Sequence, residues 1–362
     1  MEINKIFNEP CLETLKRMPN DFLDCVITSP PYWQLRDYGY EGQWGLEPTF
    51  HQYLEHLWGM MDEIYRTLKP YGTAWINLGD TYGTQSGGLK GKSTFDPKNK
   101  NATIQVIQQS KTIHKCLLLI PHRFAIGCID RGWIVRNDIV WAKRNGMPES
   151  VTDRFSKKHE YFFFMVKSEK YYFDLDAVRD KHKQVSIDRL QRGVSDTNKW
   201  VNGADGQTPH NLSQPRTNIT TKIPKEQCEM FGSPRAMQHR ETNIKFGGKK
   251  GDGNDTGIYS GNNWQPRADG KNPGSVSDFW DIPTKPSSNE HYAAYNDELI
   301  KKPILAGCPE GGIIYDPFMG TGSTAESALR ANRKFIGSEM SEKYIDIANK
   351  RLKPYLLQST LF

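Results

Sequence analysis

Residues 313–323 join a short β-rich run to a glycine turn and the start of a helical pattern. In α/β sheets such a junction lies at the carboxyl end of a strand, where glycines let the backbone approach a ligand and the helix N-terminus faces it. The turn is not a dinucleotide fingerprint, because Ala325 stands at the position of the third glycine. Glu339 ends the next predicted strand, where a carboxylate can bind both hydroxyls of a ribose. The pattern favours an adenosine-containing ligand; the alternative is a plain packing turn with a surface acid.

A second turn, Ser29-Pro30-Pro31-Tyr32, ends the apolar run 23–28. Two prolines cannot continue a β-ladder, and their fixed φ makes the turn a rigid frame for carbonyl oxygens. Such a frame can hold a planar amine while Tyr32 stacks on the ring that carries the amine. Ser29 has no histidine or lysine at a spacing typical of an activated nucleophile. The alternative interpretation is a rigid surface turn.

Strand and helix patterns alternate along the chain and predict an α/β fold. The segments 23–28, 52–68 and 73–78 are typical of a strand, a helix and a strand, with Pro70-Tyr71-Gly72 expected to end the helix. This order is a βαβ unit on a parallel sheet. The other predicted elements are helices at 116–130, 296–306, 324–331 and 342–352, strands at 133–142, 312–315 and 334–337, and a hairpin-like pair at 160–166 and 171–173.

The basic excess of the chain lies in one segment. Residues 181–275 hold 15 Lys or Arg and 9 Asp or Glu, a net of +6, whereas the rest of the chain holds 33 of each. The segment also holds 12 of the 31 glycines and little apolar alternation, so it is interpreted as loops with little core. It is either a polyanion-binding surface or a solvated linker. Aromatic side chains favour binding, because they stack on bases: Trp200, Phe231, Phe246, Tyr259 and Trp264.

Neither a membrane nor a metal is indicated by the sequence. No apolar run reaches the roughly 18 residues that a membrane helix needs, and residues 1–10 show no secretory leader. The expected compartment is the cytoplasm. The six cysteines lie far apart, so their thiols are expected to be reduced and mostly buried. His114, His122 and His159 do not have the spacing of metal ligands.

Taken together, these segments resemble the DNA amino-methyltransferases, which transfer a methyl group from S-adenosylmethionine to an exocyclic amine of cytosine or adenine. The resemblance covers residues 4–178 and 276–352, and the catalytic turn precedes the cofactor turn, as in the permuted β group of that family. Further matches are Trp141-Ala142-Lys143, Pro148, Asp153-Arg154, the strand 73–78 with Asp80, and the stretch 291–295.

The resemblance implies a Rossmann-like sheet that is mostly parallel, with one antiparallel hairpin strand and an inserted, loop-rich basic target-recognition region. We expect residues 1–180 to form the catalytic half, 181–275 the target-recognition insert and 276–362 the cofactor-binding half.

The resemblance also implies roles for individual residues. The catalytic residues would be Ser29, Pro30, Pro31 and Tyr32. S-adenosylmethionine would be bound by Asp316, Pro317, Phe318, Gly320, Thr321, Gly322 and Glu339, together with Ala293 and Tyr295. Candidate DNA contacts are Arg36, Lys90, Lys92, Lys143, Arg235, Arg240, Lys249 and Lys250. Trp33 would either close the wall of the base site or pack in the core.

Ser29 indicates the target base. Serine at the first position of this turn is typical of enzymes that methylate cytosine N4, whereas adenine enzymes usually carry Asp or Asn there. Some adenine enzymes also carry serine, so adenine N6 stays an alternative. The expected partner is double-stranded DNA with the target base flipped out. The sequence also leaves open a non-catalytic DNA-binding protein, a methyltransferase acting on RNA or a protein amide, a cognate restriction endonuclease as a partner, and a homodimer.

Overall fold

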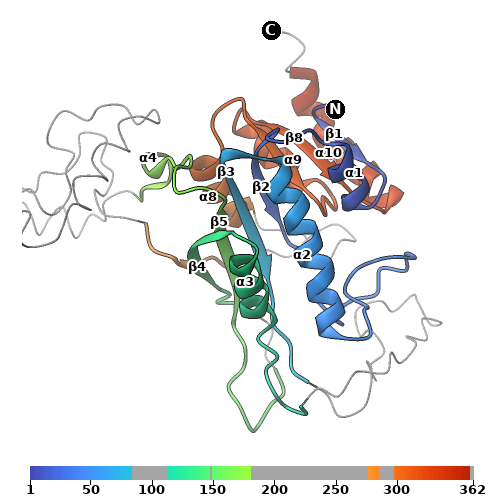
Figure 1. Cartoon of the computed structure of the whole chain (residues 1–362), viewed down its shortest axis with the longest axis vertical. Helices are drawn as coiled ribbons and strands as arrows, with labels where there is room; N and C mark the ends of the chain where they lie inside the picture. The colour runs from blue at the N-terminus through green and yellow to red at the C-terminus, as the bar shows by residue number, and fades with distance from the viewer. Residues whose placement is uncertain (84–112, 147–148, 181–275, 285–296, 359–362) are drawn as a thin grey trace, which may run out of the picture. The chain divides into compact units, whose positions relative to one another are not determined.

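The computed structural model describes residues 1–83, 113–146, 149–180, 276–284 and 297–358 of the chain (Figure 1). The chain divides into two compact units, one made of Met1–Phe173 and Asp278–Phe362 and the other of Asp174–Ser277. In the second unit the described residues include the short helix α4 (Leu175–Val178), which the Asp174 side chain caps by accepting from the Ala177 N–H at 3.0 Å. The expected target-recognition insert at 181–275 lies outside the described residues.

An eight-stranded sheet forms the centre of the first unit, in the order β1-β8-β7-β2-β3-β5-β4-β6. Neighbouring strands are parallel except β5, which is antiparallel to both β3 and β4. The predicted mostly parallel sheet with one antiparallel strand is therefore confirmed. The strands are β1 (Lys5–Phe7), β2 (Leu23–Thr28), β3 (Leu68–Leu78), β4 (Ile134–Ala142), β5 (His159–Val166), β6 (Phe279–Asp281), β7 (Ile313–Asp316) and β8 (Lys334–Ser338).

Helices cover both faces of the sheet because successive strand residues point to opposite sides. Val26 and Phe163 pack into one buried cluster, whereas their neighbours Ile27 and Phe164 pack into another. The first cluster is completed by α1 (Cys11–Arg17), α2 (Phe50–Thr67) and α3 (Ile120–Asp130). The second is completed by α8 (Asp297–Gly307), α9 (Ser323–Arg330) and α10 (Glu342–Gln358).

The predicted βαβ unit exists as β2-α2-β3, but its last strand starts earlier than expected. The helix ends at Thr67, and Pro70-Tyr71-Gly72 lies inside β3. The pairing of β3 with β2 is irregular there, passing from Leu68 opposite Leu23 to Thr73 opposite Cys25. Because a bulge tolerates a proline that a regular ladder excludes, the three residues extend the strand instead of separating it from the helix.

Two other predictions are corrected at element boundaries. Helix α3 starts at Ile120 and not at residue 116, because the φ of Leu119 is +55°, which is not helical. The residue before it binds the segment that follows β3: the Leu118 N–H donates to the Thr81 carbonyl at 3.0 Å. Residues 171–173 form no strand, since β5 pairs with β3 and β4 instead. In the described residues the pattern also missed four short elements, β1, α1, α4 and β6, which are three to seven residues long.

The direction of winding reverses between β7 and β2. From β2 the chain proceeds to β3 on one side, and from β7 it proceeds to β8 on the other. The carboxyl ends of these two adjacent parallel strands form the crevice in which ligands of open α/β sheets bind. The two predicted turns, at Ser29 and at Pro317, follow these two strand ends.

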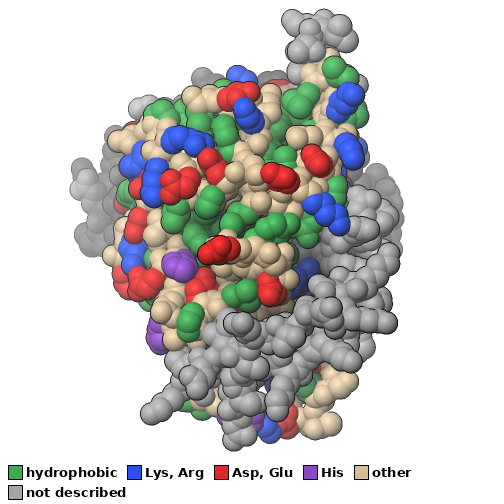
Figure 2. Space-filling model, turned by 90° about the vertical axis from the view of Figure 1, so that its right-hand side faces the viewer, with side chains coloured by type: hydrophobic (Ala, Val, Ile, Leu, Met, Phe, Trp, Pro, Cys, Tyr) green, Lys and Arg blue, Asp and Glu red, His purple; other side chains and the backbone are tan. Residues whose placement is uncertain are grey.

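The described part of the chain contains no helix that is both long and apolar enough to cross a membrane. Figure 2 shows acidic and basic side chains interspersed over one face of the molecule. The charge on that face therefore does not indicate where a polyanion would bind.

Candidate active site

A cavity of about 350 Å³ lies at the carboxyl ends of β2 and β7, and both predicted turns line it. Its size falls within the range of small-molecule sites. From the catalytic turn it is lined by Ser29, Pro30, Pro31 and Tyr32, and from the cofactor turn by Pro317, Phe318, Gly320 and Thr321, with Glu339 beside them. Tertiary structure thus brings together two motifs that lie almost 290 residues apart in the sequence.

Asp316 holds the two turns together from behind the cavity wall. Its carboxylate is almost fully buried and accepts hydrogen bonds from the Thr28 hydroxyl at 2.8 Å and the Thr324 hydroxyl at 2.6 Å. The Phe318 N–H donates to the same carboxylate at 3.0 Å. Burial raises the pKa of Asp316 to about 6, although these hydrogen bonds oppose the shift. Asp316 is therefore a buried strut between β2, β7 and α9, and it does not line the cavity.

Glu339 lies in the cavity wall and organises the glycine turn. One carboxylate oxygen accepts from the Gly320 N–H and the other from the Ser341 N–H, both at 2.9 Å. Burial raises the pKa of Glu339, and the backbone N–H groups limit the rise. Each carboxylate oxygen has a second lone pair, so the group can also accept from the hydroxyls of a ligand.

Gly322 stands where the backbone and the packing both require glycine. Its φ is +82°, and a Cβ there would lie 2.9 Å from the Cβ of Ala348 in α10. This residue ends the turn and begins α9 without touching the cavity. Close helix packing, and not a ligand, explains why this position is glycine.

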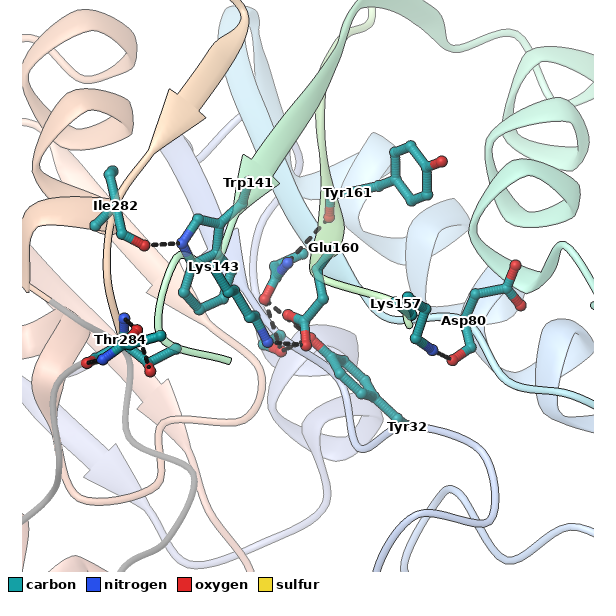
Figure 3. Close-up of polar contacts among 12 residues, drawn as sticks. Tyr32, Asp80, Trp141, Lys143, Lys157, Glu160, Tyr161, Ile282 and Thr284 are labelled. Carbon is teal, nitrogen blue, oxygen red and sulfur yellow. Dashed lines mark hydrogen bonds and ion pairs between the residues drawn. The ribbon is translucent and has the colours of Figure 1, made fainter. Parts of the chain in front are cut away.

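A polar cluster lines the catalytic side of the cavity. The Tyr32 hydroxyl donates to Glu160 at 2.8 Å and lies 3.0 Å from Oδ1 of Asn77, while Ser29 Oγ lies 3.4 Å from the same Oδ1 (Figure 3). Lys143 forms an ion pair with Glu160. The residues of this cluster come from β3, β5 and the ends of β2 and β4, which belong to one sheet.

The Tyr32 ring is held by close backbone contacts. A Cβ on Gly79 would lie 2.6 Å from the ring, and a Cβ on Gly45 would lie 2.8 Å from the Tyr32 carbonyl oxygen. The neighbouring Pro31 carbonyl accepts from the Tyr53 hydroxyl at 2.8 Å. The turn is therefore anchored on both sides, and the ring is already positioned before any ligand binds.

Trp44 forms part of the cavity wall that the sequence did not indicate. Its ring contacts Phe318 edge-on, with centroids 5.4 Å apart, and stacks on His56 at 5.5 Å. The buried Glu47 fixes this wall, because its carboxylate bonds His56 at 2.9 Å. Of the two interpretations of Trp33, core packing is the one observed: the ring is buried and donates to the Glu47 carbonyl at 2.9 Å.

Two of the predicted DNA contacts line the cavity. Arg36 belongs to the loop after the catalytic turn, and Lys143 belongs to the polar cluster on the catalytic side. The remaining predicted contacts and two predicted cofactor ligands lie outside the described residues: Lys90, Lys92, Arg235, Arg240, Lys249, Lys250, Ala293 and Tyr295.

Asn77 and Glu160 are two further cavity residues that the sequence did not indicate. Both lie at the carboxyl edge of the sheet, Asn77 near the end of β3 and Glu160 at the start of the antiparallel β5. The strand ends were a usable signal, but the neighbour relation between β3 and β5 was not visible in the sequence. In the described ranges no three His, Cys, Asp or Glu side chains are grouped to hold a metal ion.

The chain has an α/β sheet with a ligand cavity at its switch point, and a Ser-Pro-Pro-Tyr turn and a glycine turn line that cavity. This is the architecture of an enzyme that binds a nucleotide-like ligand. The chain belongs to the N6_N4_Mtase family of DNA methylases, whose family model matches residues 23–350. It is a DNA methyltransferase of the N4/N6 type.

Two curated relatives are similar over most of their length. The type II methyltransferase M.Cfr9I of Citrobacter freundii is 30% identical over 357 residues, which cover 98% of this chain and 89% of the relative. The type II methyltransferase M.XycI of Xanthomonas campestris pv. cyanopsidis is 31% identical over 350 residues, covering 96% of this chain and 87% of the relative.

Solved structures share the fold. The PvuII DNA methyltransferase, described as cytosine-N4-specific, matches with a TM-score of 0.55 at 15% identity over 97% of this chain and 86% of its own. A DNA modification methylase of Thermus thermophilus, complexed with S-adenosyl-L-methionine, matches with a TM-score of 0.50 at 17% identity, over 97% and 94% of the two chains.

Proposed function

We propose that this DNA methyltransferase transfers a methyl group from S-adenosylmethionine to the N4 amine of a cytosine flipped out of duplex DNA. The observation that carries the proposal is Ser29, which begins the Ser-Pro-Pro-Tyr turn and lines the same cavity as Gly320 and Glu339. Serine at this position is typical of the cytosine enzymes of the family. The fold shared with the PvuII enzyme, described as cytosine-N4-specific, agrees with this target.

The cofactor half of the cavity fits an adenosine-containing sulfonium compound. Glu339 presents a half-buried carboxylate beside the Gly320 turn, which suits the two hydroxyls of a ribose. Phe318 and Trp44 supply an aromatic wall for the flat adenine. When bound, S-adenosylmethionine supplies an electrophilic methyl group, so the protein needs no covalent intermediate of its own.

The catalytic half holds the amine that attacks. An exocyclic amine conjugated to its base is a weak nucleophile, so its lone pair must be freed and directed. Ser29 Oγ and the Pro30 carbonyl would accept the two N–H bonds of the amine, which favours a tetrahedral nitrogen. The oxygen of Asn77 lies 3.4 Å from Ser29 Oγ and can accept a hydrogen bond from the hydroxyl, leaving a lone pair on Oγ directed at the amine.

Tyr32 would hold the base itself. A base stacked and paired inside duplex DNA cannot enter this cavity, so it must leave the stack first. The Tyr32 ring lines the cavity, and Glu160 and Gly79 restrain its position. A ring that is restrained in advance loses little conformational freedom when the base stacks on it.

The names of the relatives suggest a second partner besides the target duplex. Because the curated relatives are named type II methyltransferases, we expect a restriction endonuclease of the same sequence specificity to accompany this protein. Homodimer formation and the DNA contacts of Arg36 and Lys143 stay predictions from the sequence.

The test is to incubate the protein with tritiated S-adenosylmethionine and unmethylated genomic DNA, digest the DNA to nucleosides and identify the labelled one by chromatography and mass. Label in N4-methylcytosine is the expected result. Label in N6-methyladenine would overturn the cytosine assignment while preserving the reaction. Absence of label from the DNA nucleosides would overturn the proposed substrate. Tyr32→Ala serves as the control for background labelling.

A further inference from the structure

The loop between β4 and β5 carries an unusual aromatic residue. Phe155 is 97% exposed, more than any other large apolar side chain in the described part of the structure. The loop extends from the carboxyl edge of the sheet below β4 and β5 (Figure 1). An aromatic ring in water forgoes the free energy of burial, which contact with a partner would supply.

Contacts on both sides of Phe155 hold its backbone in place. Before it, Asp153 pairs with Lys115 at 2.5 Å, and Arg154 pairs with Glu149 at 2.6 Å. The Arg154 guanidinium also lies over the Tyr82 ring, 4.0 Å from its centroid. The Arg154 side chain donates in addition to the Phe155 carbonyl at 3.0 Å. These contacts present the ring from an anchored loop.

The anchor leads directly to the catalytic side of the cavity. Lys157, two residues after Phe155, donates to the carbonyl of Asp80 (Figure 3). The residue before Asp80 is Gly79, whose backbone packs against the Tyr32 ring. The loop also starts at Lys143 and ends two residues before Glu160, and both of these residues line the cavity. Phe155 is therefore attached to the same wall that positions Tyr32.

The charge of the loop suits a polyanion. Residues 143–158 hold five Lys or Arg and two Asp or Glu. Lys143 and Arg144 pair with acids of β5 and β6, whereas Lys157 binds a backbone carbonyl. An ammonium group has three N–H donors, so a carbonyl contact leaves Lys157 able to bind a phosphate oxygen. Proteins that kink or unstack nucleic acids combine basic side chains with an apolar side chain in this way.

We propose that Phe155 enters the base stack of the duplex and occupies the space that the flipped target base leaves. This inference rests on the proposed function and adds to it the residue that keeps the base extruded. Extrusion costs the stacking and pairing of the target base, and a wedge recovers part of that cost by stacking on the neighbouring bases. Phe155 is a positioning residue, since it acts on the DNA and not on the reacting amine.

The test compares Phe155→Ala with the wild-type chain on two synthetic duplexes that carry the recognition sequence, which is located first by mapping the methylated positions in treated genomic DNA. One duplex is fully paired, and the other has an abasic site opposite the target base, which lowers the cost of extrusion. We expect kcat/KM to fall about tenfold on the paired duplex, as for the loss of one base–aromatic stack. On the abasic duplex we expect the variant to match the wild type.

Two further variants separate the wedge from a structural effect. Phe155→Trp keeps an aromatic ring and should retain activity on the paired duplex. Ile129→Ala removes another exposed apolar side chain, in the last turn of α3, and should leave both activities unchanged. Thermal unfolding of each variant shows whether the fold is intact.

The outcomes are distinct. Equal losses on the two duplexes would show a role other than filling the gap and would overturn the proposal, as would a Phe155→Ala variant that matches the wild type on both. A change in self-association without a change in methylation would assign Phe155 to a protein interface instead. A wild-type chain that methylates neither duplex would overturn the proposed function together with the wedge.

Discussion

The Tyr32 hydroxyl donates a 2.8 Å hydrogen bond to the Glu160 carboxylate and thereby links the catalytic turn after β2 to the start of β5. Glu160 also pairs with Lys143, so a single carboxylate restrains two side chains of the cavity. Because β5 is the antiparallel strand, its first residues reach the edge where the parallel strands end. The reversed strand thus contributes a carboxylate at the place where ligands bind.

Two substitutions at Tyr32 distinguish its ring from its hydroxyl. Tyr32→Ala removes the stacking surface and should lower kcat about 100-fold or more. Tyr32→Phe keeps the ring and removes the hydroxyl, with its contact to Asn77 and its charge-assisted hydrogen bond to Glu160, a bond worth about 1.5–3 kcal/mol, and should lower kcat about tenfold. Steady-state kinetics with S-adenosylmethionine binding as a control checks both. Equal losses for Ala and Phe would contradict the stacking role.

Glu339→Ala should weaken the binding of S-adenosylmethionine. We expect the Kd to rise about 10- to 100-fold, because a half-buried carboxylate that accepts from ligand hydroxyls is lost. Calorimetric titration measures the change. Glu342→Ala is the matched control, since Glu342 is exposed in the first turn of α10 only three residues away. A Kd for Glu339→Ala within twofold of the wild-type value would remove Glu339 from the cofactor site.

Asp316 makes the stability of the fold depend on pH. Burial raises its pKa from an ordinary 3.8 to about 6, so the folded protein binds this proton more tightly than the unfolded chain does. The stabilisation from this group is complete below its unfolded pKa and disappears as the pH rises through its folded pKa. A shift of about two units corresponds to about 3 kcal/mol.

Asp316→Asn tests this dependence because asparagine does not titrate. The free energy of unfolding of the wild type minus that of the variant should fall by about 3 kcal/mol between about pH 4 and pH 7. Urea denaturation at each pH provides the measurement, with the exposed Asp346 replaced by Asn as the control. A difference that stays constant over this range would contradict the raised pKa.

Gly322→Ala should destabilise the protein by about 2 kcal/mol or more. The left-handed φ of +82° disfavours a side chain, and the new Cβ would lie 2.9 Å from Ala348. Adding Ala348→Gly should restore part of the loss by removing the close contact. Gly59→Ala, at an exposed helix position with open space around its Cα, should instead stabilise slightly. Equal unfolding temperatures for Gly322→Ala and Gly59→Ala would show that the backbone angle and the contact with Ala348 do not require glycine at position 322.

Local pattern was sufficient for much of the fold. The strand 23–28 was predicted with its observed bounds, and the glycine turn and the acid at Glu339 were placed at the ends of their strands. These features depend on residues a few positions apart, such as an apolar run stopped by Pro30 or a glycine before a helix. Such signals act within one element and are readable without knowing its neighbours.

Relations between distant segments were not readable in that way. The order of strands places Glu160 beside Tyr32 and Asn77, and a bulge against β2 lets β3 include Pro70. Asp316 is a buried strut because Thr28 and Thr324 converge on it from separate elements. The identity of the motif residues can therefore be predicted from the local sequence. The residues that hold them in place are decided by strand pairing and packing, because the free energy of packing comes from contacts between residues far apart in the chain.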